Sequence, residues 1–160
     1  MDFDCARLAS DLGGRLAGPG ADSDAPVAAG LSIDSRTLLG GELFAAVADA
    51  RDGHDVVPAA RGAGAAAVLV ARPVDAGWSV VVPAVREALV RIARLSRRRL
   101  PDFVVGVTGS VGKTTTKDLL GAVLGERFAT TASQRSFNNE LGVPITLANA
   151  PDGTEATVVE

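Results

Sequence analysis

Apolar residues recur along the chain in two patterns, short unbroken runs and wider spacings of about three or four residues, which are typical of buried strands and of helices respectively. Strands are predicted at 27–33, 43–47, 66–70, 80–82, 104–107, 128–131 and 156–160. Helices are predicted at 3–12, 56–61 and 84–99, with another over 118–124 and a helix start near 138. This alternation of strand and helix with short connections predicts an α/β fold.

The elements group into two parts joined by an amphipathic helix. Residues 1–83 are expected to form a small α/β domain, 84–101 the connecting helix, and 102–160 the beginning of a second domain. In the connecting helix Val85, Leu89, Ile92 and Leu95 lie on one side and most arginines lie off it. The arginines at 97–99 are interpreted as a solvated helix end that complements the helix dipole.

Composition and charge restrict the possible partners. The chain has 160 residues, 47% of them apolar and 22% charged, with a formal net charge of −3. This composition is typical of a soluble globular protein and leaves no basic footprint for nucleic acid or an anionic membrane. The acidic amino terminus lacks the order of a secretory signal, so a cytoplasmic protein is expected. The single cysteine, Cys5, is predicted to be a small buried residue of the first helix.

The most informative motif is a glycine-rich stretch between the apolar run at 104–107 and the helix that follows. It reads Thr108-Gly109-Ser110-Val111-Gly112-Lys113-Thr114-Thr115. Glycines let an anion approach bare backbone N–H groups at a helix start, a lysine reaches the outer phosphates, and the next hydroxyl is placed to ligate Mg²⁺. Val107 stands where the general pattern requires glycine, so only the shorter core of that pattern is present. Lys113 and Lys117 are the only lysines beside fourteen arginines.

Other residues are weaker candidates for function. Glu160 ends a predicted strand, where an acid beside the loop strand can hold Mg²⁺. Asn138 and Asn139 offer amide side chains near a predicted helix start. Asp34, Ser35 and Arg36 follow a strand and read either as a substrate contact or as a locally paired turn. The only histidine, His54, is expected to be structural rather than a catalytic base.

Taken together, these stretches resemble the Mur ligase family of peptidoglycan synthesis. The resemblance rests on five motifs that occur in the family's order: Asp-Ser-Arg at 34–36, Gly-Glu-Leu-Phe at 41–44, Asp-Gly-His at 52–54, the phosphate loop at 108–114, and Phe-Asn-Asn-x-x-Gly-x-Pro at 137–144. The Asn pair favours the member that adds D-alanyl-D-alanine to UDP-N-acetylmuramoyl-tripeptide over the member that adds the third amino acid. Nearly the whole chain takes part.

The resemblance implies an ATP-dependent amide ligase that works through an acyl phosphate. Its fold would be a small α/β substrate domain followed by the first part of a P-loop ATPase parallel sheet with flanking helices. Residues 109–115 would bind ATP, with Lys113 on the β and γ phosphates, and Thr114 and Glu160 on Mg²⁺; Lys113 and Glu160 would be the catalytic residues. The UDP-linked substrate would contact Asp34, Ser35, Arg36, Arg51, Asn138 and Asn139.

The resemblance also implies a monomer that acts on small molecules. Because family members are longer, this chain is not expected to catalyse ligation by itself. Three alternatives stay open. The chain could be a non-catalytic nucleotide-sugar binding module, another Mur ligase that adds a different amino acid, or a generic P-loop switch with a protein partner. Separate binding of Mg-ATP and of the nucleotide sugar distinguishes the module and the switch from a ligase.

Overall fold

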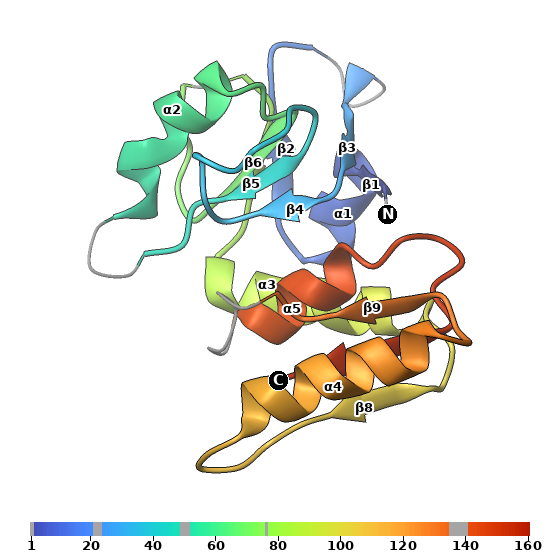
Figure 1. Cartoon of the computed structure of the whole chain (residues 1–160). Helices are drawn as coiled ribbons and strands as arrows, with labels where there is room; N and C mark the ends of the chain where they lie inside the picture. The colour runs from blue at the N-terminus through green and yellow to red at the C-terminus, as the bar shows by residue number, and fades with distance from the viewer. Residues whose placement is uncertain (1, 21–23, 49–51, 76, 135–140) are drawn as a thin grey trace. The chain divides into compact units, whose positions relative to one another are not determined.

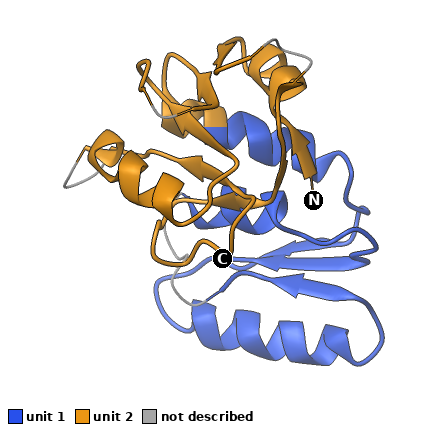
Figure 2. Ribbon diagram, turned by 90° about the horizontal axis from the view of Figure 1, so that it is seen from above, with its two compact units in different colours: residues 1, 89–160 blue, residues 2–88 orange. Residues whose placement is uncertain are grey.

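The computed structural model describes residues 2–20, 24–48, 52–75, 77–134 and 141–160 (Figure 1). Its internal contacts divide the chain into two compact units, residues 2–88 and residues 89–160, coloured separately in Figure 2. The division falls inside helix α3 (Val85–Arg97), so each unit holds part of that helix. Each unit has its own sheet.

Unit 2–88 is built on a five-stranded sheet. The order is β2 (Arg15–Ala17), β7 (Ser79–Val81), β6 (Ala67–Val70), β5 (Leu43–Ala45) and β4 (Leu31–Ser32). From β4 to β7 neighbouring strands run parallel, whereas β2 pairs antiparallel with β7. The carboxyl ends of β4, β5, β6 and β7 therefore meet at one edge, the edge at which parallel sheets hold ligands.

Three short elements and a strand pair complete this unit. Strands β1 (Asp2–Asp4) and β3 (Val27–Ala29) pair antiparallel, helix α1 (Cys5–Asp11) follows β1, and the 3-10 helix η2 (Gly53–Val56) leads into helix α2 (Val57–Gly62). Val57 and Ala60 of α2 pack with Phe44, Val68 and Val70 of the sheet. Strand β6 is buried along its whole length, which explains its unbroken apolar sequence.

Unit 89–160 has a three-stranded parallel sheet in the order β8 (Val104–Gly106), β10 (Ala156–Val159), β9 (Thr130–Ala132). In Figure 2 the sheet lies between helix α4 (Lys113–Gly125) on one side and α5 (Gly142–Ala148) with the remainder of α3 on the other. Ala93 and Leu100 pack with Leu147 and Ala150 in the core of that second side. The loop strand β8 is an edge strand among the described residues.

The α/β class with parallel sheets is confirmed, while three predicted elements are wrong in detail. The helix predicted over 3–12 begins only at Cys5, because Phe3 belongs to β1 and the Asp4 carboxylate caps the helix by accepting from two backbone N–H groups. The strand predicted over 27–33 is broken at Gly30, whose φ of +102° separates β3 from β4. Strand β2 lies in a stretch that composition predicted to be loop.

No helix in the described part of the chain combines the length and the apolar composition needed to cross a bilayer. Cys5 is fully buried on α1, as predicted.

Candidate nucleotide and substrate sites

The glycine-rich loop connects the end of β8 to the start of α4, so strand, loop and helix follow in the predicted order. Gly109 has φ +152° and Gly112, the N-cap of α4, has φ +78°, conformations that residues with a Cβ rarely adopt. The space beside both glycines is open: a Cβ on Gly112 would meet nothing within 4 Å, and one on Gly109 would meet only Val111 O at 3.7 Å. A phosphate can therefore approach this backbone.

The other predicted loop residues lie around this opening. Ser110 and Val111 are exposed at the tip of the loop, Val111 to 90%, and Thr115 is exposed on the first turn of α4. Lys113 turns back over the loop and its Nζ donates to Gly109 O at 2.9 Å. From this position the ammonium group can replace its hydrogen bond to Gly109 O by one to a phosphate oxygen. A charged phosphate oxygen binds an ammonium group more strongly than a neutral carbonyl does.

Thr114 and Glu160 meet at the carboxyl end of β10, the strand beside β8. The Thr114 hydroxyl donates to the Glu160 carboxylate, with Oγ1 3.0 Å from Oε2 and 3.3 Å from Oε1. These residues are 46 positions apart in the chain. A hydroxyl and a carboxylate at this separation, both half-buried, are the oxygen ligands that Mg²⁺ takes from a protein.

The donor set also fits Mg²⁺ better than a metal that needs a full protein cage. No group of three or more His, Cys, Asp or Glu side chains able to hold a metal occurs among the residues described. Mg²⁺ commonly takes one or two protein oxygens and completes its shell with phosphate oxygens and water. Thr114 and Glu160 could hold the ion in that way, while no alternative metal centre competes in this part of the chain.

The predicted substrate residues Asp34, Ser35 and Arg36 form a turn at the carboxyl end of β4. Arg36 donates to Asp34 from Nε at 2.8 Å and from its terminal nitrogen at 2.6 Å, and from its backbone N–H at 3.0 Å. The Arg36 guanidinium lowers the pKa of Asp34 to about 2, so the carboxylate is charged at neutral pH. Arg36 is 86% exposed. The structure therefore agrees with both interpretations of this motif, as a substrate contact and as a locally paired turn, because the turn is paired locally and also open to solvent.

A second charged group lies at the same sheet edge, beyond β5 and β6. Asp52 accepts from the backbone and side chain of His54 and from Arg72, with the His54 Nδ1 at 2.6 Å and the Arg72 nitrogen at 2.8 Å. The His54 hydrogen bonds first, and Arg72 next, hold the pKa of Asp52 well below its usual range. His54 Nε2 also accepts from the Ala71 N–H at 3.2 Å. The histidine thus joins the segments after β5 and β6, a structural role.

Sequence reasoning missed two residues in these sites. Arg72 carries no local motif, and only the parallel pairing of β5 with β6 brings it to Asp52. The sequence drew attention to Lys117 only because it is one of two lysines. In the structure Lys117 is 1% exposed and is the only buried charged residue among those described. Arg51, Asn138 and Asn139 lie outside the described residues.

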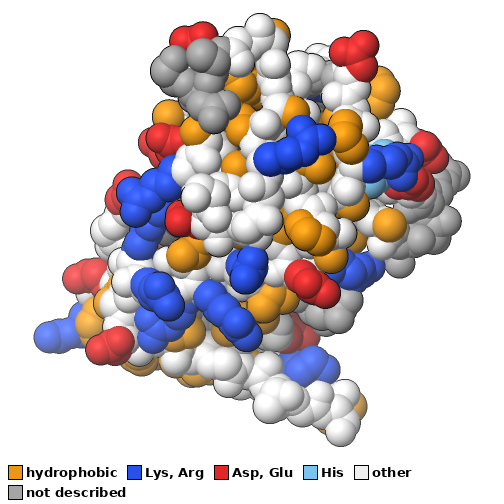
Figure 3. All heavy atoms as spheres, turned by 180° about the vertical axis from the view of Figure 1, so that it is seen from behind, with side chains coloured by type: hydrophobic (Ala, Val, Ile, Leu, Met, Phe, Trp, Pro, Cys, Tyr) orange, Lys and Arg blue, Asp and Glu red, His pale blue; other side chains and the backbone are white. Residues whose placement is uncertain are grey.

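Charged side chains of both signs lie on the face shown in Figure 3, where several Lys and Arg side chains lie close together in the lower half of the view.

Known protein families match residues of both units. Residues 28–105 match the family model described as "Mur ligase family, catalytic domain", and residues 107–160 match "Mur ligase middle domain". A UDP-N-acetylmuramoyl-tripeptide--D-alanyl-D-alanine ligase of Synechocystis sp. is 40% identical over 135 residues, covering 81% of this chain and 30% of the relative.

Solved structures agree. MurF from Acinetobacter baumannii superposes with a TM-score of 0.83 at 28% identity, covering 100% of this chain and 36% of that one. A MurF ligase from Thermotoga maritima in complex with ADP gives a TM-score of 0.68 at 32% identity, covering 82% of this chain and 31% of that one. The chain thus spans about a third of the length of the proteins it matches.

Proposed function

The chain belongs to the Mur ligase family, and from that membership we propose that it carries the nucleotide-sugar-binding and phosphate-binding parts of an ATP-dependent amide ligase. The ligase adds D-alanyl-D-alanine to UDP-N-acetylmuramoyl-tripeptide in peptidoglycan synthesis, the reaction that the relatives' names state. The observation that carries the proposal is the contact between Thr114 and Glu160 beside an open glycine loop.

In the nucleotide half, the loop backbone from Gly109 to Gly112 and the start of α4 would bind the phosphates of ATP, with Ser110, Val111 and Thr115 around them. Lys113 would move from Gly109 O to the β and γ phosphates, and Thr114 and Glu160 would hold Mg²⁺ there. These positive charges would draw negative charge away from the γ-phosphate. That would favour attack on its phosphorus by a carboxylate oxygen of the tripeptide, with ADP as the leaving group. A similar ligase, the one from Thermotoga maritima, was solved in complex with ADP, which supports an adenine nucleotide as the ligand.

In the substrate half, the proposal places the UDP-linked tripeptide at the carboxyl edge of β4 to β7, where Asp34, Ser35 and Arg36 are exposed or half-buried. Arg36 offers a planar guanidinium that suits a diphosphate. Arg51, Asn138 and Asn139 remain proposed contacts. The acyl phosphate would then be attacked by the amine of D-alanyl-D-alanine, releasing phosphate and forming the amide. We place this small-molecule chemistry in the cytoplasm, in a monomer.

Calorimetric titration of the chain with Mg-ATP and, separately, with UDP-N-acetylmuramoyl-tripeptide tests the proposal. Lys113→Ala should weaken Mg-ATP binding by at least about tenfold, since a charge-assisted contact contributes about 1.5–3 kcal/mol. It should leave the tripeptide titration unchanged. Arg127→Ala, which removes an exposed charge after α4, is the matched control and should bind both ligands as the unaltered chain does.

The results separate the alternatives. Binding of the tripeptide without Mg-ATP would reduce the chain to a nucleotide-sugar recognition module, and binding of a nucleoside triphosphate without the tripeptide would favour a P-loop switch. Exchanging D-alanyl-D-alanine for single amino acids in a phosphate-release assay tests whether another Mur ligase activity fits better. The prediction that this chain alone does not ligate is refuted by phosphate release that depends on both peptide substrates.

A further inference from the structure

A buried ammonium group lies one helical turn beyond the phosphate-binding lysine. Lys117 follows Lys113 by four residues on α4, so the two side chains lie on the same face of the helix. Its side chain is 2% exposed, and its Nζ donates to Ser133 O at 2.5 Å and pairs with the Asp118 carboxylate at 3.0 Å. A buried charge is unfavourable unless it is paired, so these partners fix the position of the side chain.

The partner of Lys117 is tied to the strand that carries Glu160. Ser133 follows β9, and its backbone N–H donates to Val158 O of β10 at 2.9 Å. Val158 precedes Glu160 by two residues, Glu160 comes directly after the last residue of that strand, and its carboxylate accepts from Thr114 on α4. Helix α4 is therefore joined to the carboxyl end of β10 at two points, through Thr114 directly and through Lys117 by way of Ser133.

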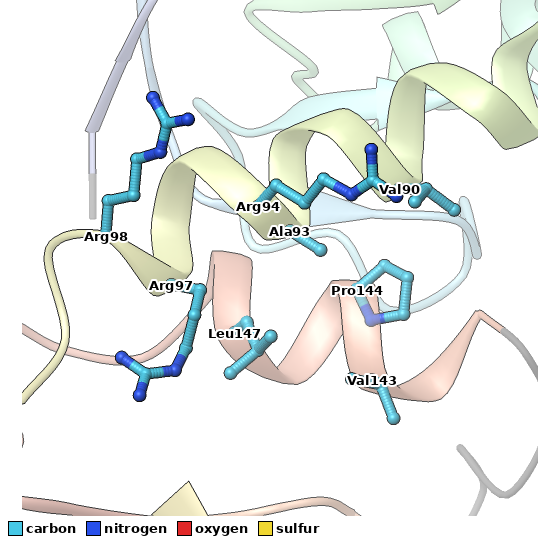
Figure 4. Close-up of a pocket in the computed structure, with 8 residues that line it drawn as sticks. All are labelled: Val90, Ala93, Arg94, Arg97, Arg98, Val143, Pro144 and Leu147. Carbon is cyan, nitrogen blue, oxygen red and sulfur yellow. The ribbon is translucent and has the colours of Figure 1, made fainter. Parts of the chain in front are cut away.

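Helix α5 supports the same segment from the other side. The Thr146 hydroxyl lies 3.0 Å from that of Ser133 and donates to Gly142 O at 2.8 Å. On another face of α5, Pro144 is directed toward helix α3 in Figure 4, and Leu147 packs with Ala93 of α3. Ser133 thus lies between a helix that packs on α3 and a helix that carries the phosphate loop.

We propose that Lys117 is a positioning residue, which holds the first turn of α4 at the distance from Glu160 that a Mg²⁺ ion shared by Thr114 and Glu160 requires. An apolar residue at this place could pack in several positions along the helix axis, whereas the ammonium must meet the Ser133 carbonyl. A compact ammonium also meets a single carbonyl better than a planar guanidinium does, and this chain uses arginine at all other basic positions except Lys113. The inference rests on the proposed nucleotide site and adds a residue that does not touch the ligand.

The readout is the ratio of the ATP dissociation constants measured with EDTA and with Mg²⁺, because this ratio reports the metal geometry of the folded protein and not its stability. Lys117→Met should reduce the ratio by at least about tenfold, while ATP binding in EDTA changes by less than about threefold because the loop and Lys113 remain. Leu100→Ala, which opens the α3–α5 core of the same unit, is the control for destabilisation and should keep the ratio. Ser133→Ala retains the carbonyl and should also keep it.

An unchanged ratio in folded Lys117→Met protein overturns the inference and leaves the proposed function intact. If Lys117→Met does not fold, Lys117→Arg decides, since it keeps the charge and displaces the donor: a reduced ratio supports positioning and an unchanged ratio overturns it. Failure of the unaltered chain to bind Mg-ATP refutes the proposed nucleotide site and the inference with it.

Discussion

Alanine substitution of Gly53 should destabilise unit 2–88 strongly although it adds a single methyl group. Gly53 opens η2, and a Cβ built there would lie 2.4 Å from Val47 O and 2.5 Å from Ala46 C. Both are backbone atoms of the segment after β5, so no side-chain rotation relieves the overlap. The glycine of the Asp-Gly-His motif is required for this close approach and not for a left-handed backbone.

The expected magnitude follows from the packing. Overpacking a well-filled site costs about 1–3 kcal/mol, and a clash with backbone lies at or above the upper end, about 3 kcal/mol. Gly62, the last residue of α2, is the matched control, because its Cβ would meet nothing within 4 Å. Helix propensity favours alanine over glycine by up to about 1 kcal/mol, so Gly62→Ala should be neutral or stabilising. The two alanine variants should therefore differ by about 3–4 kcal/mol.

Urea unfolding followed by tryptophan fluorescence measures this difference directly, since the single tryptophan, Trp78, lies in the same unit. Tripeptide binding to Gly53→Ala should weaken in parallel in the calorimetric titration, because Arg51, a proposed substrate contact, lies two positions before Gly53 in the sequence. Equal free energies of unfolding for Gly53→Ala and the unaltered chain, within about 0.5 kcal/mol, would refute the packing argument, since surface substitutions produce changes of that size.

Three further substitutions have definite expected outcomes. Arg61→Met should lower the free energy of unfolding by about 2–4 kcal/mol in the urea assay, because the half-buried guanidinium donates to three backbone carbonyls, among them that of Trp78. Burial raises the pKa of the Cys5 thiol to about 11, so stability should fall as the pH rises from about 9 to 11, where the unfolded thiol ionises first, and Cys5→Ala should remove that slope. Thr114→Ala should weaken Mg-ATP binding by about tenfold in calorimetry, and its effect should shrink in a Glu160→Gln background if the two groups share one ion.

The loop and its acidic partner were predictable because both signals are local. Glycines and a lysine between an apolar run and a helix start predict a phosphate-binding loop, and Glu160 ends a run that reads as a strand. The approach of Thr114 to Glu160 required the additional fact that β10 pairs with β8, which sequence suggests only by general rules for parallel sheets.

Residues whose environment depends on distant pairing escaped prediction. Arg72 meets Asp52 because β5 and β6 are neighbours, and Lys117 is buried where its Nζ meets the carbonyl of Ser133, just after β9. The start of α1 was misplaced for a local reason. Phe3 matches the apolar spacing of a helix. The Asp4 carboxylate, however, caps the backbone N–H groups of the first turn, so the helix begins after Asp4 and does not include Phe3.

The order of strands in unit 89–160 has a consequence for folding kinetics. Strand β10 lies between β8 and β9, and neither of these pairs with the other. Until β10 inserts, the backbone groups of both earlier strands lack partners in this sheet, and the loop has no Glu160 beside it. The sheet should therefore assemble in one late, cooperative step that closes a long stretch of chain, and the proposed nucleotide site and the sheet should appear with the same rate constant.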